Sequence, residues 1–198
     1  MNTNPIAITG RWTHGWALDM HTIQSIPLGL DEWGHEMFDT TRSEMGEAIF
    51  KLKYRNDRTQ VAPIAKTVAN FIRGKVELAD INAIIAVPPS NMARRFQPVP
   101  VLAAAIGSKL NLQVPTNYLI KTKRTTPLKD ISDKQKRHED LKGAFKVADG
   151  RFVGAHVLLF DDLIRSGETL NAISTTLISQ GKVAKVSVVT ATITRIKR

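Results

Sequence analysis

The chain has 198 residues, of which 42% are hydrophobic and 23% charged, which excludes a fibrous or disordered protein and suits one domain with elaborations. It contains no cysteine, which excludes disulfides, thiolate catalysis and cysteine-ligated zinc. With 28 Lys and Arg against 18 Asp and Glu, the formal net charge is +10, which favours polyanionic partners such as nucleic acid, nucleotides or pyrophosphate.

The sequence shows no sign of membrane insertion or secretion. No apolar run approaches the roughly 18 to 20 residues needed to span a bilayer. The polar start, MNTNPIAITGRW, lacks the basic and apolar regions of a secretion signal. We therefore expect a cytoplasmic protein.

The chain changes character near residue 80, where a mixed segment gives way to alternating strand and helix patterns. We expect residues 1–80 to form an N-terminal elaboration and residues 81–198 to form the core, within one structural domain. Thr9–Leu30 carries Thr, Trp and Ile residues interrupted by glycine and proline, which predicts short strands and turns. We assign it a small hairpin-like lead-in.

Two helices are expected next, the first after the candidate N-cap Ser43 and the second ending at Gly74. Apolar residues recur at helical spacing in both, as Met45, Ile49 and Leu52 in the first and Ile64, Val68, Phe71 and Ile72 in the second. Each helix therefore has one apolar face to bury.

The remainder of the chain alternates apolar strands with amphipathic helices. The strands are expected at 84–87, 118–120, 157–160 and 186–193, with helices over 101–110 and 170–177. Continuous aliphatic strands separated by such helices are typical of a parallel sheet covered on both faces. We predict an α/β fold with a mostly parallel twisted sheet and right-handed crossovers.

The segment Val157–Leu170 (VLLFDDLIRSGETL) carries the strongest chemical pattern. An apolar strand delivers two adjacent carboxylates, Asp161 and Asp162, to the edge of the sheet where ligands bind in open α/β folds. Gly167 permits close backbone approach, and the free N–H groups of the following helix can donate to a phosphate. The carboxylates can accept hydrogen bonds from sugar hydroxyls or contact Mg²⁺. Together these features describe a ribose 5-phosphate site.

This segment resembles the phosphoribosyl pyrophosphate (PRPP) signature of type I phosphoribosyltransferases: an apolar strand, two acids, two aliphatic residues and a short Thr/Ser/Gly turn. The resemblance implies the fold of that family with a small N-terminal hood-like elaboration. It implies that Asp161 and Asp162 act as catalytic residues that bind the ribose hydroxyls, and that they hold Mg²⁺ directly or through those hydroxyls and water. The 5-phosphate would then be bound by the turn, Arg165, Ser166, Gly167, Glu168 and Thr169.

The turn departs from the usual family pattern at two positions. Arg165 stands where Thr is common, and it can strengthen anion binding or point away. Glu168 stands where a small residue is common, and its charge opposes a phosphate unless the side chain turns outward or favours the helix dipole. Two acids after a strand can also simply cap a helix, but the complete order of strand, acids, turn and helix favours the ligand site.

A second segment, Val87–Gln97 (VPPSNMARRFQ), resembles part of the ComF-like (competence-protein) phosphoribosyltransferases, although the usual glycine between Arg95 and Phe96 is missing. The resemblance implies a pyrophosphate-binding loop made of Pro88, Pro89, Ser90, Asn91, Arg94 and Arg95. Hydroxyl, amide and guanidinium groups after a strand can donate to a diphosphate. The alternative is an ordinary loop with a solvated arginine pair.

Residues 121–145 are the most charged part of the chain. Ser132 and Gln135 suit a capping box and Gly143 a helix stop. A similar stretch in ComF-like proteins follows a flexible loop, which implies a basic lid that excludes water and neutralises the departing pyrophosphate. We expect the lid to use Lys121, Lys123, Arg124 and Arg137. A solvated face explains any one of these lysines equally well.

Other polar and aromatic residues of the N-terminal segment are weaker candidates. His14, Asp19 and His21 match no firm metal-ligand spacing, so strand packing is the favoured interpretation. The aromatic side chains that can face a base from a hood, or can equally serve packing, are Trp12, Trp16, Trp33 and Phe38.

The resemblance implies a phosphoribosyltransferase that binds Mg²⁺·PRPP and transfers the phosphoribosyl group to a nitrogenous base or related acceptor, releasing pyrophosphate, with a homodimer as a family expectation. The charge of +10 supports an alternative, a non-catalytic nucleotide or single-stranded nucleic acid binding protein related to DNA uptake or PRPP sensing. A third possibility is a defence effector that acts on a nucleotide pool. No residue pattern identifies the acceptor base.

Overall fold

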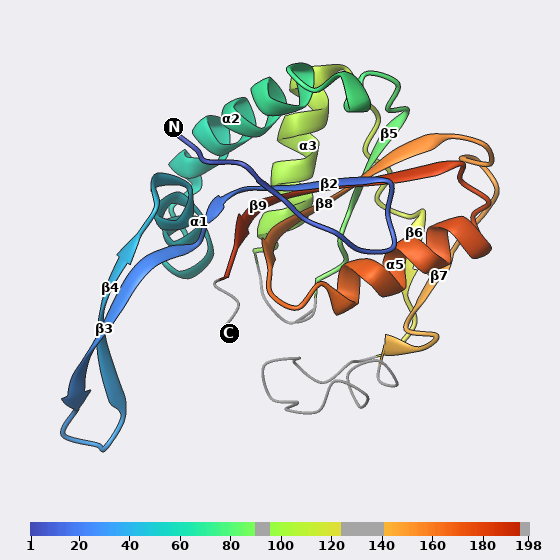
Figure 1. Ribbon diagram of the computed structural model, residues 1–198. Helices are drawn as coiled ribbons and strands as arrows, with labels where there is room; N and C mark the ends of the chain where they lie inside the picture. The colour runs from blue at the N-terminus through green and yellow to red at the C-terminus, as the bar shows by residue number, and fades with distance from the viewer. Residues whose placement is uncertain (90–95, 124–140, 195–198) are drawn as a thin grey trace.

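The computed structural model describes residues 1–89, 96–123 and 141–194. Its centre is a five-stranded sheet in the order β1-β2-β9-β8-β5 (Figure 1). The strands are β1 (Ile6–Ala7), β2 (His14–Met20), β5 (Ala83–Ala86), β8 (His156–Ile164) and β9 (Lys185–Ile193). β2, β9, β8 and β5 run parallel, and β1 pairs antiparallel with β2 at the edge. This arrangement confirms the predicted α/β fold with a mostly parallel sheet.

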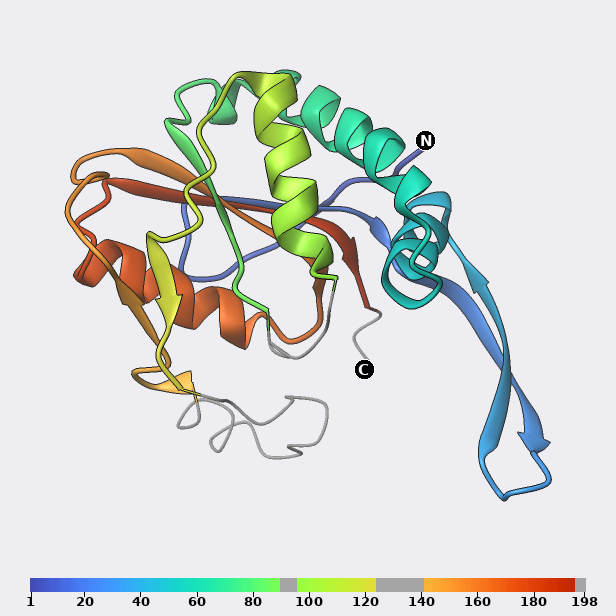
Figure 2. The same ribbon diagram turned by 180° about the vertical axis from the view of Figure 1, so that it is seen from behind.

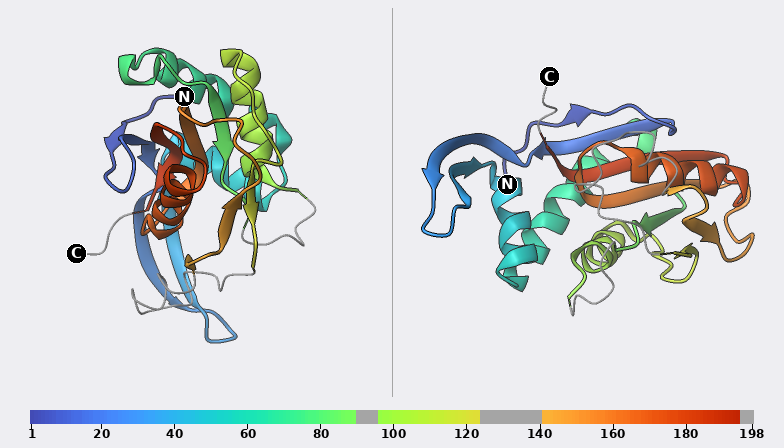
Figure 3. Two further views of the ribbon diagram at one scale, coloured as in Figure 1. Left: turned by 90° about the vertical axis from the view of Figure 1, so that its right-hand side faces the viewer. Right: turned by 90° about the horizontal axis from the view of Figure 1, so that it is seen from below.

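Helices cover both faces of the sheet, as predicted. α2 (Val61–Arg73) and α3 (Pro98–Leu110) lie on one face, and α5 (Glu168–Ser179) lies on the other (Figure 3, left). α1 (Glu44–Tyr54) begins after Ser43, whose Oγ accepts the Gly46 N–H at 2.9 Å. Two 3-10 turns, Arg58–Gln60 and Val76–Leu78, flank α2. Within the described ranges, no helix is long and apolar enough to cross a lipid bilayer.

The prediction for residues 9–30 is wrong for β2. This strand lies inside the central sheet, between β1 and β9, instead of in a lead-in hairpin. A half-buried strand shows alternating polar and apolar residues, but Ala17 and Leu18 are adjacent and both fully buried. The sequence of β2 therefore lacks the alternation that would have indicated a strand of the central sheet. The hairpin follows it: β3 (Thr22–Leu30) pairs with β4 (Glu36–Arg42) and projects from the body (Figures 1 and 2). The domain division at residue 80 remains a prediction.

The strand expected at 118–120 is also placed differently. β6 (Leu119–Lys121) pairs antiparallel with β7 (Phe145–Val147) in a separate two-stranded sheet. The outer edge of β5 is instead contacted by Gln113, whose carbonyl accepts the Ile84 N–H at 3.0 Å. A run of three apolar residues predicts a strand but does not say which sheet it joins.

The connections leave β5 and β8 in opposite directions. From β5 the chain passes through α3 to Gln113, on the side of β5 away from β8. From β8 it passes through α5 to β9, on the side of β8 away from β5. The carboxyl ends of these two neighbouring strands form a topological switch point, the place where open α/β sheets bind ligands.

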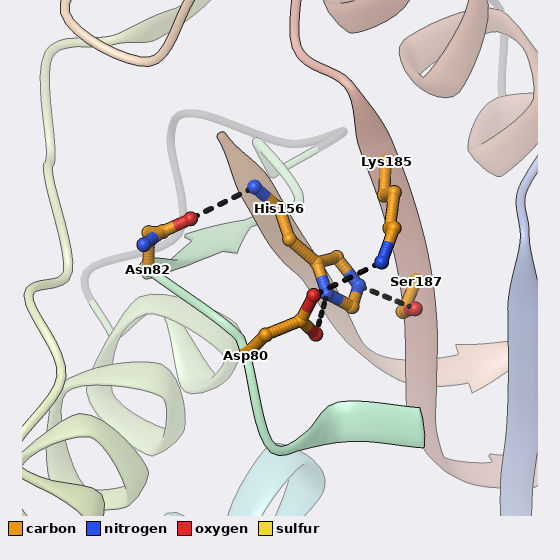
Figure 4. A network of polar contacts seen from close by, with 5 residues as sticks. All are labelled: Asp80, Asn82, His156, Lys185 and Ser187. Atoms are coloured by element: carbon orange, nitrogen blue, oxygen red, sulfur yellow. Dashed lines mark hydrogen bonds and ion pairs between the residues drawn. The ribbon is translucent and has the colours of Figure 1, made fainter. Parts of the chain in front are cut away.

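A polar network, of which His156 and Ser187 are buried, joins the amino ends of the strands at the opposite edge (Figure 4). The His156 ring lies 2.5 Å from Asp80 Oδ1 through Nδ1 and 2.8 Å from Ser187 Oγ through Nε2. Lys185 Nζ donates to the other Asp80 oxygen at 3.0 Å, and Asn82 Oδ1 accepts the His156 N–H at 2.8 Å. Serine, histidine and aspartate in this order can form a nucleophilic site, but Ser187 is fully buried and no substrate can reach its Oγ. The network therefore holds β8 and β9 to the segment before β5.

We expect Asp80→Asn to destabilise the fold in a pH-dependent manner. The hydrogen bond with His156, followed by that from Lys185, lowers the pKa of Asp80 from 3.8 to about 2. The stabilisation is therefore complete above about pH 4 and is lost as the pH falls towards 2. Urea denaturation of the variant at pH 7 should show a lower unfolding free energy, and the difference from wild type should shrink between pH 4 and 2. Glu77→Gln, an exposed acid nearby, is the control; a constant difference across this range contradicts the assignment.

α1 packs directly on the chain that follows β2. A Cβ atom at Gly46 would lie 2.1 Å from the His21 carbonyl oxygen, so only glycine allows this approach. Ser43 Oγ adds a hydrogen bond to the Met20 carbonyl at 2.6 Å. These contacts hold α1 against the end of β2 and the base of the hairpin.

Gly46→Ala should therefore lower the unfolding free energy by about 1–3 kcal/mol, because backbone atoms must move to admit the methyl group. Gly74→Ala is the matched control, since its Cβ would lie 3.6 Å from the nearest atoms. Thermal and urea unfolding measure both variants. Equal stability of the two variants would contradict the close approach.

Candidate functional site

The two predicted acids lie within β8 instead of after it. The strand expected to end at Phe160 continues to Ile164 because β9 pairs with it up to Ile193, whereas β5 pairs with it only as far as Phe160. Successive side chains of a strand point to opposite faces, so Asp161 and Asp162 leave β8 on opposite sides of the sheet. Both nevertheless lie where β8 extends past the end of β5.

Asp162 points towards α1. Its Oδ2 lies 2.7 Å from Lys53 Nζ, and the side chains of the aspartate and the lysine are 7% and 23% exposed. Thr192 Oγ1 of β9 donates to the Asp162 carbonyl at 3.0 Å. The carboxylate is thus neutralised by a cation from the N-terminal elaboration, which the sequence analysis did not single out.

Asp161 lies on the face covered by α5. Its Oδ1 accepts the Asp162 N–H at 2.8 Å. Burial, followed by the negative charge of Asp162, raises the pKa of Asp161 well above its usual range.

The turn after β8 has the form that anion binding requires. Arg165 and Ser166 are exposed, and Gly167 adopts a φ of +76° that favours glycine. α5 begins at Glu168, and within the described chain no side chain caps its amino end. The N–H groups of a first helical turn have no partner inside the helix and attract anions. The predicted order of strand, acids, turn and helix is present, while phosphate binding by residues 165–169 remains a prediction.

The N-terminal loop packs beside this turn. A Cβ atom on Gly167 would lie 3.8 Å from the Trp12 ring, which is held by a 3.1 Å hydrogen bond from its Nε1 to the Ile8 carbonyl. The Arg11 N–H donates to Asn171 Oδ1 of α5 at 2.7 Å. Trp12 is therefore placed beside the candidate phosphate turn.

The other aromatic candidates lie elsewhere. Trp16 packs edge-to-face against Phe71 of α2, with ring centroids 5.9 Å apart, so it contributes to the body of the protein. Trp33 and Phe38 lie on the projecting hairpin and are 76% and 49% exposed. Contact of these residues with a base remains a prediction.

The segment after β5 lies beside the end of β8. The Val87 N–H donates to the Phe160 carbonyl at 2.9 Å, and Pro88 and Pro89 follow, partly buried. The remaining residues of the predicted pyrophosphate loop, Ser90, Asn91, Arg94 and Arg95, lie outside the described residues. Pro88 and Pro89 therefore lie at the switch point, while pyrophosphate binding by this loop remains a prediction.

The base of the predicted lid is described in part. Lys121 ends β6 and Lys123 lies two residues further on, next to Thr122, whose N–H donates to the Ala144 carbonyl at 2.9 Å. The other lid residues, Arg124 and Arg137, and the predicted capping box Ser132–Gln135 lie outside the described residues.

Sequence reasoning missed a cationic cluster where β2 and β9 end. His21 follows β2, Arg42 ends β4 and Lys53 lies on α1. Burial lowers the pKa of His21, and the charges of Arg42, Lys53 and Arg165 lower it further while Asp162 opposes them. His21 and the cations around it, Arg42, Lys53 and Arg165, come from separate parts of the chain, so no sequence motif joins them.

The hydrogen bonds of His21 define its tautomer. Thr192 Oγ1 donates its proton to the Asp162 carbonyl, so it must accept from His21 Nδ1, which lies 3.1 Å away. The neutral ring therefore carries its hydrogen on Nδ1. His14 stacks on Trp16 at 5.9 Å, and the described residues contain no group of three or more metal-ligating side chains. The structure thus agrees with the packing interpretation for His14.

No protein-family model and no curated protein matches the chain. Among solved structures, adenine phosphoribosyltransferase from Trypanosoma brucei, in complex with AMP, pyrophosphate and ribose-5-phosphate, matches with a TM-score of 0.52 and 10% identity over 98% of this chain and 87% of that one. The enzyme of the same name from Leishmania tarentolae matches with a TM-score of 0.49 and 8% identity over 97% of this chain and 95% of that one.

UMP synthase from Leishmania donovani matches with a TM-score of 0.42 and 16% identity; the match covers 80% of this chain but only 26% of that longer one. Identities this low show the fold alone. The chain has the α/β fold of the type I phosphoribosyltransferases.

Proposed function

We propose that the carboxyl edge of the sheet binds PRPP and that the protein transfers its phosphoribosyl group to a nitrogenous acceptor with release of pyrophosphate. The observation that carries this proposal is the amino end of α5, which has no side-chain cap within the described residues and follows the end of β8, with Asp161 and Asp162, after a short turn at the switch point. The 5-phosphate would lie against the turn 165–169, and the ribose hydroxyls against the two acids. The diphosphate would face the loop after β5. A cytoplasmic location and the finer ComF-like assignment belong to the same proposal.

The donor set fits Mg²⁺ that is carried by the substrate. Asp161 and Asp162 point to opposite faces, and Oδ2 of Asp162 is already bound by Lys53. The two carboxylates therefore cannot chelate one ion together, which favours contact through ribose hydroxyls and water over direct ligation. The metal would supply positive charge to the departing diphosphate.

The reaction needs no nucleophilic side chain. The lone pair of the acceptor nitrogen forms a bond to C1 of the ribose, and the C1–O bond to pyrophosphate breaks with its electron pair leaving on the diphosphate. The transition state carries positive charge at C1, so the protein acts by orienting the sugar and stabilising the leaving group. Asp162, held rigidly by Lys53, is positioned for the first task.

The double substitution Asp161→Asn with Asp162→Asn should lower kcat/KM for pyrophosphate release by at least about 100-fold, the size expected for lost transition-state contacts. The assay combines Mg²⁺·PRPP with a panel of bases, and calorimetry measures PRPP binding separately. Asp149→Asn, in an exposed pair with Arg151, is the matched control and should leave both unchanged. Unaltered turnover in the double variant would remove the acids from the mechanism.

The net charge of +10 supports the alternative, a non-catalytic nucleotide or single-stranded nucleic acid binding protein. The exposed aromatic residues of the hairpin do not add to it, because residues 22–41 contain no Lys or Arg and carry Asp31, Glu32, Glu36 and Asp39. Stacking platforms for single strands combine aromatic side chains with cations. Homodimer formation likewise remains a proposal.

If the alternative is correct, a single-stranded oligonucleotide should bind with an affinity that falls steeply with salt, because phosphate contacts release counterions. Fluorescence anisotropy between 50 and 200 mM salt would measure a loss of about 10³-fold or more for six or more contacts. In the same measurement, PRPP is added as a competitor of the oligonucleotide. Weak binding that changes little with salt counts against this function.

A further inference from the structure

The geometry of displacement at C1 indicates where the acceptor must lie, if the proposed function holds. A nucleophile approaches C1 from the face opposite to the departing group. The proposed diphosphate position is the loop after β5, on one side of β8. The acceptor therefore belongs on the other side of β8, above the ends of β9 and β2.

The side chains at that location come from the N-terminal elaboration. His21 lies at the end of β2 and Lys53 on α1, and in Figure 1 α1 and the base of the hairpin lie beside the end of β9. Lys53 already binds Asp162 at 2.7 Å. Arg42 stands opposite Thr22 in the hairpin, so it lies next to His21 at the base of the arm.

Arg42 is the least satisfied of these cations. Its guanidinium lies 3.8 Å above the centre of the Phe50 ring, which covers one of its flat faces and leaves its edge to donate hydrogen bonds. The nearest acid, Glu47, approaches only to 3.6 Å, beyond hydrogen-bond distance. In the described part of the chain, Nε of Arg42 is buried and has no hydrogen-bond partner. Because Nε is closed to solvent, a ligand would meet the terminal amino groups of Arg42, whose side chain is 22% exposed.

We infer that the acceptor carries a carboxylate and that Arg42 binds it, with Lys53 and Arg165 contributing positive charge. The planar edge of a guanidinium matches the two oxygens of a carboxylate. A neutral base would gain nothing from the positive charge of the three cations. The acceptor class is therefore an anionic, carboxylated nitrogen heterocycle.

This assignment keeps the atoms and electrons of the transfer balanced. The ring nitrogen forms the bond to C1, pyrophosphate leaves with the electron pair of the C1–O bond, and any proton on that nitrogen passes to water. The carboxylate takes no part in bond formation. It positions the ring, so Arg42 is expected to affect binding of the acceptor more than the chemical step.

The experiment compares matched pairs of bases that differ in charge: nicotinate with nicotinamide, and orotate with uracil. Adenine and hypoxanthine serve as further neutral bases. Pyrophosphate release is measured with Mg²⁺·PRPP for the full chain, and calorimetry first establishes PRPP binding. We expect kcat/KM for at least one carboxylated base to exceed that of its neutral partner by about tenfold or more, as expected for a charge-assisted contact.

Arg42→Gln tests the residue that carries the inference. It should raise the KM of the carboxylated base by about tenfold with little change in kcat, and Arg42→Lys should restore part of the loss. Turnover of a neutral base, where measurable, should stay within about threefold of wild type. Arg151→Gln, an exposed arginine paired with Asp149, is the matched control.

The outcomes separate this inference from the proposed function. Absence of PRPP binding overturns the proposed function itself. PRPP binding with equal or better use of neutral bases, or with no use of any carboxylated base, overturns the assignment of the acceptor while leaving the PRPP site in place. An unchanged KM in Arg42→Gln removes Arg42 from the acceptor site.

Discussion

The ion pair between Lys53 and Asp162 connects α1 to the carboxyl end of β8. Removing either partner would leave a largely buried charge without compensation, which is among the costliest single changes in a protein. Lys53 reaches Asp162 only because α1 lies against the end of β2, where Gly46 allows contact with the His21 backbone. The helix α1 is thus part of the candidate site, since it supplies the cation that pairs with Asp162.

The two edges of the central sheet illustrate opposite uses of polar side chains. At the amino edge, His156 has a partner at each ring nitrogen and Ser187 is fully buried, so the network is complete and stabilises the fold. At the carboxyl edge, α5 has no side-chain cap in the described chain and Nε of Arg42 has no partner. Buried polar atoms without a partner also occur elsewhere in the described chain, at the Tyr118 hydroxyl and at Ser174 Oγ, so the exposed amino end of α5 is the feature that sets the carboxyl edge apart.

Much of the fold and part of the site could be predicted because they depend on neighbouring residues. The strand, acids, turn and helix of Val157–Leu170 are consecutive, and the apolar spacing of α1 and α2 is local. The prediction failed where partners are distant: β2 joins the central sheet and β6 leaves it, because strand pairing is decided by which edges meet. The pairing of β8 with β9 likewise extends the strand past Asp161 and Asp162, so that they face opposite sides.

The sequence by itself determined the class of fold and the position of the candidate site along the chain, because apolar periodicity, adjacent acids and a glycine turn act within a few residues of one another. Only the tertiary structure decided which charges surround that site. His21, Arg42 and Lys53 are brought together by the packing of β2, the hairpin and α1, and electrostatic interactions depend on distance in space. The charges around the candidate site are therefore brought together only by folding.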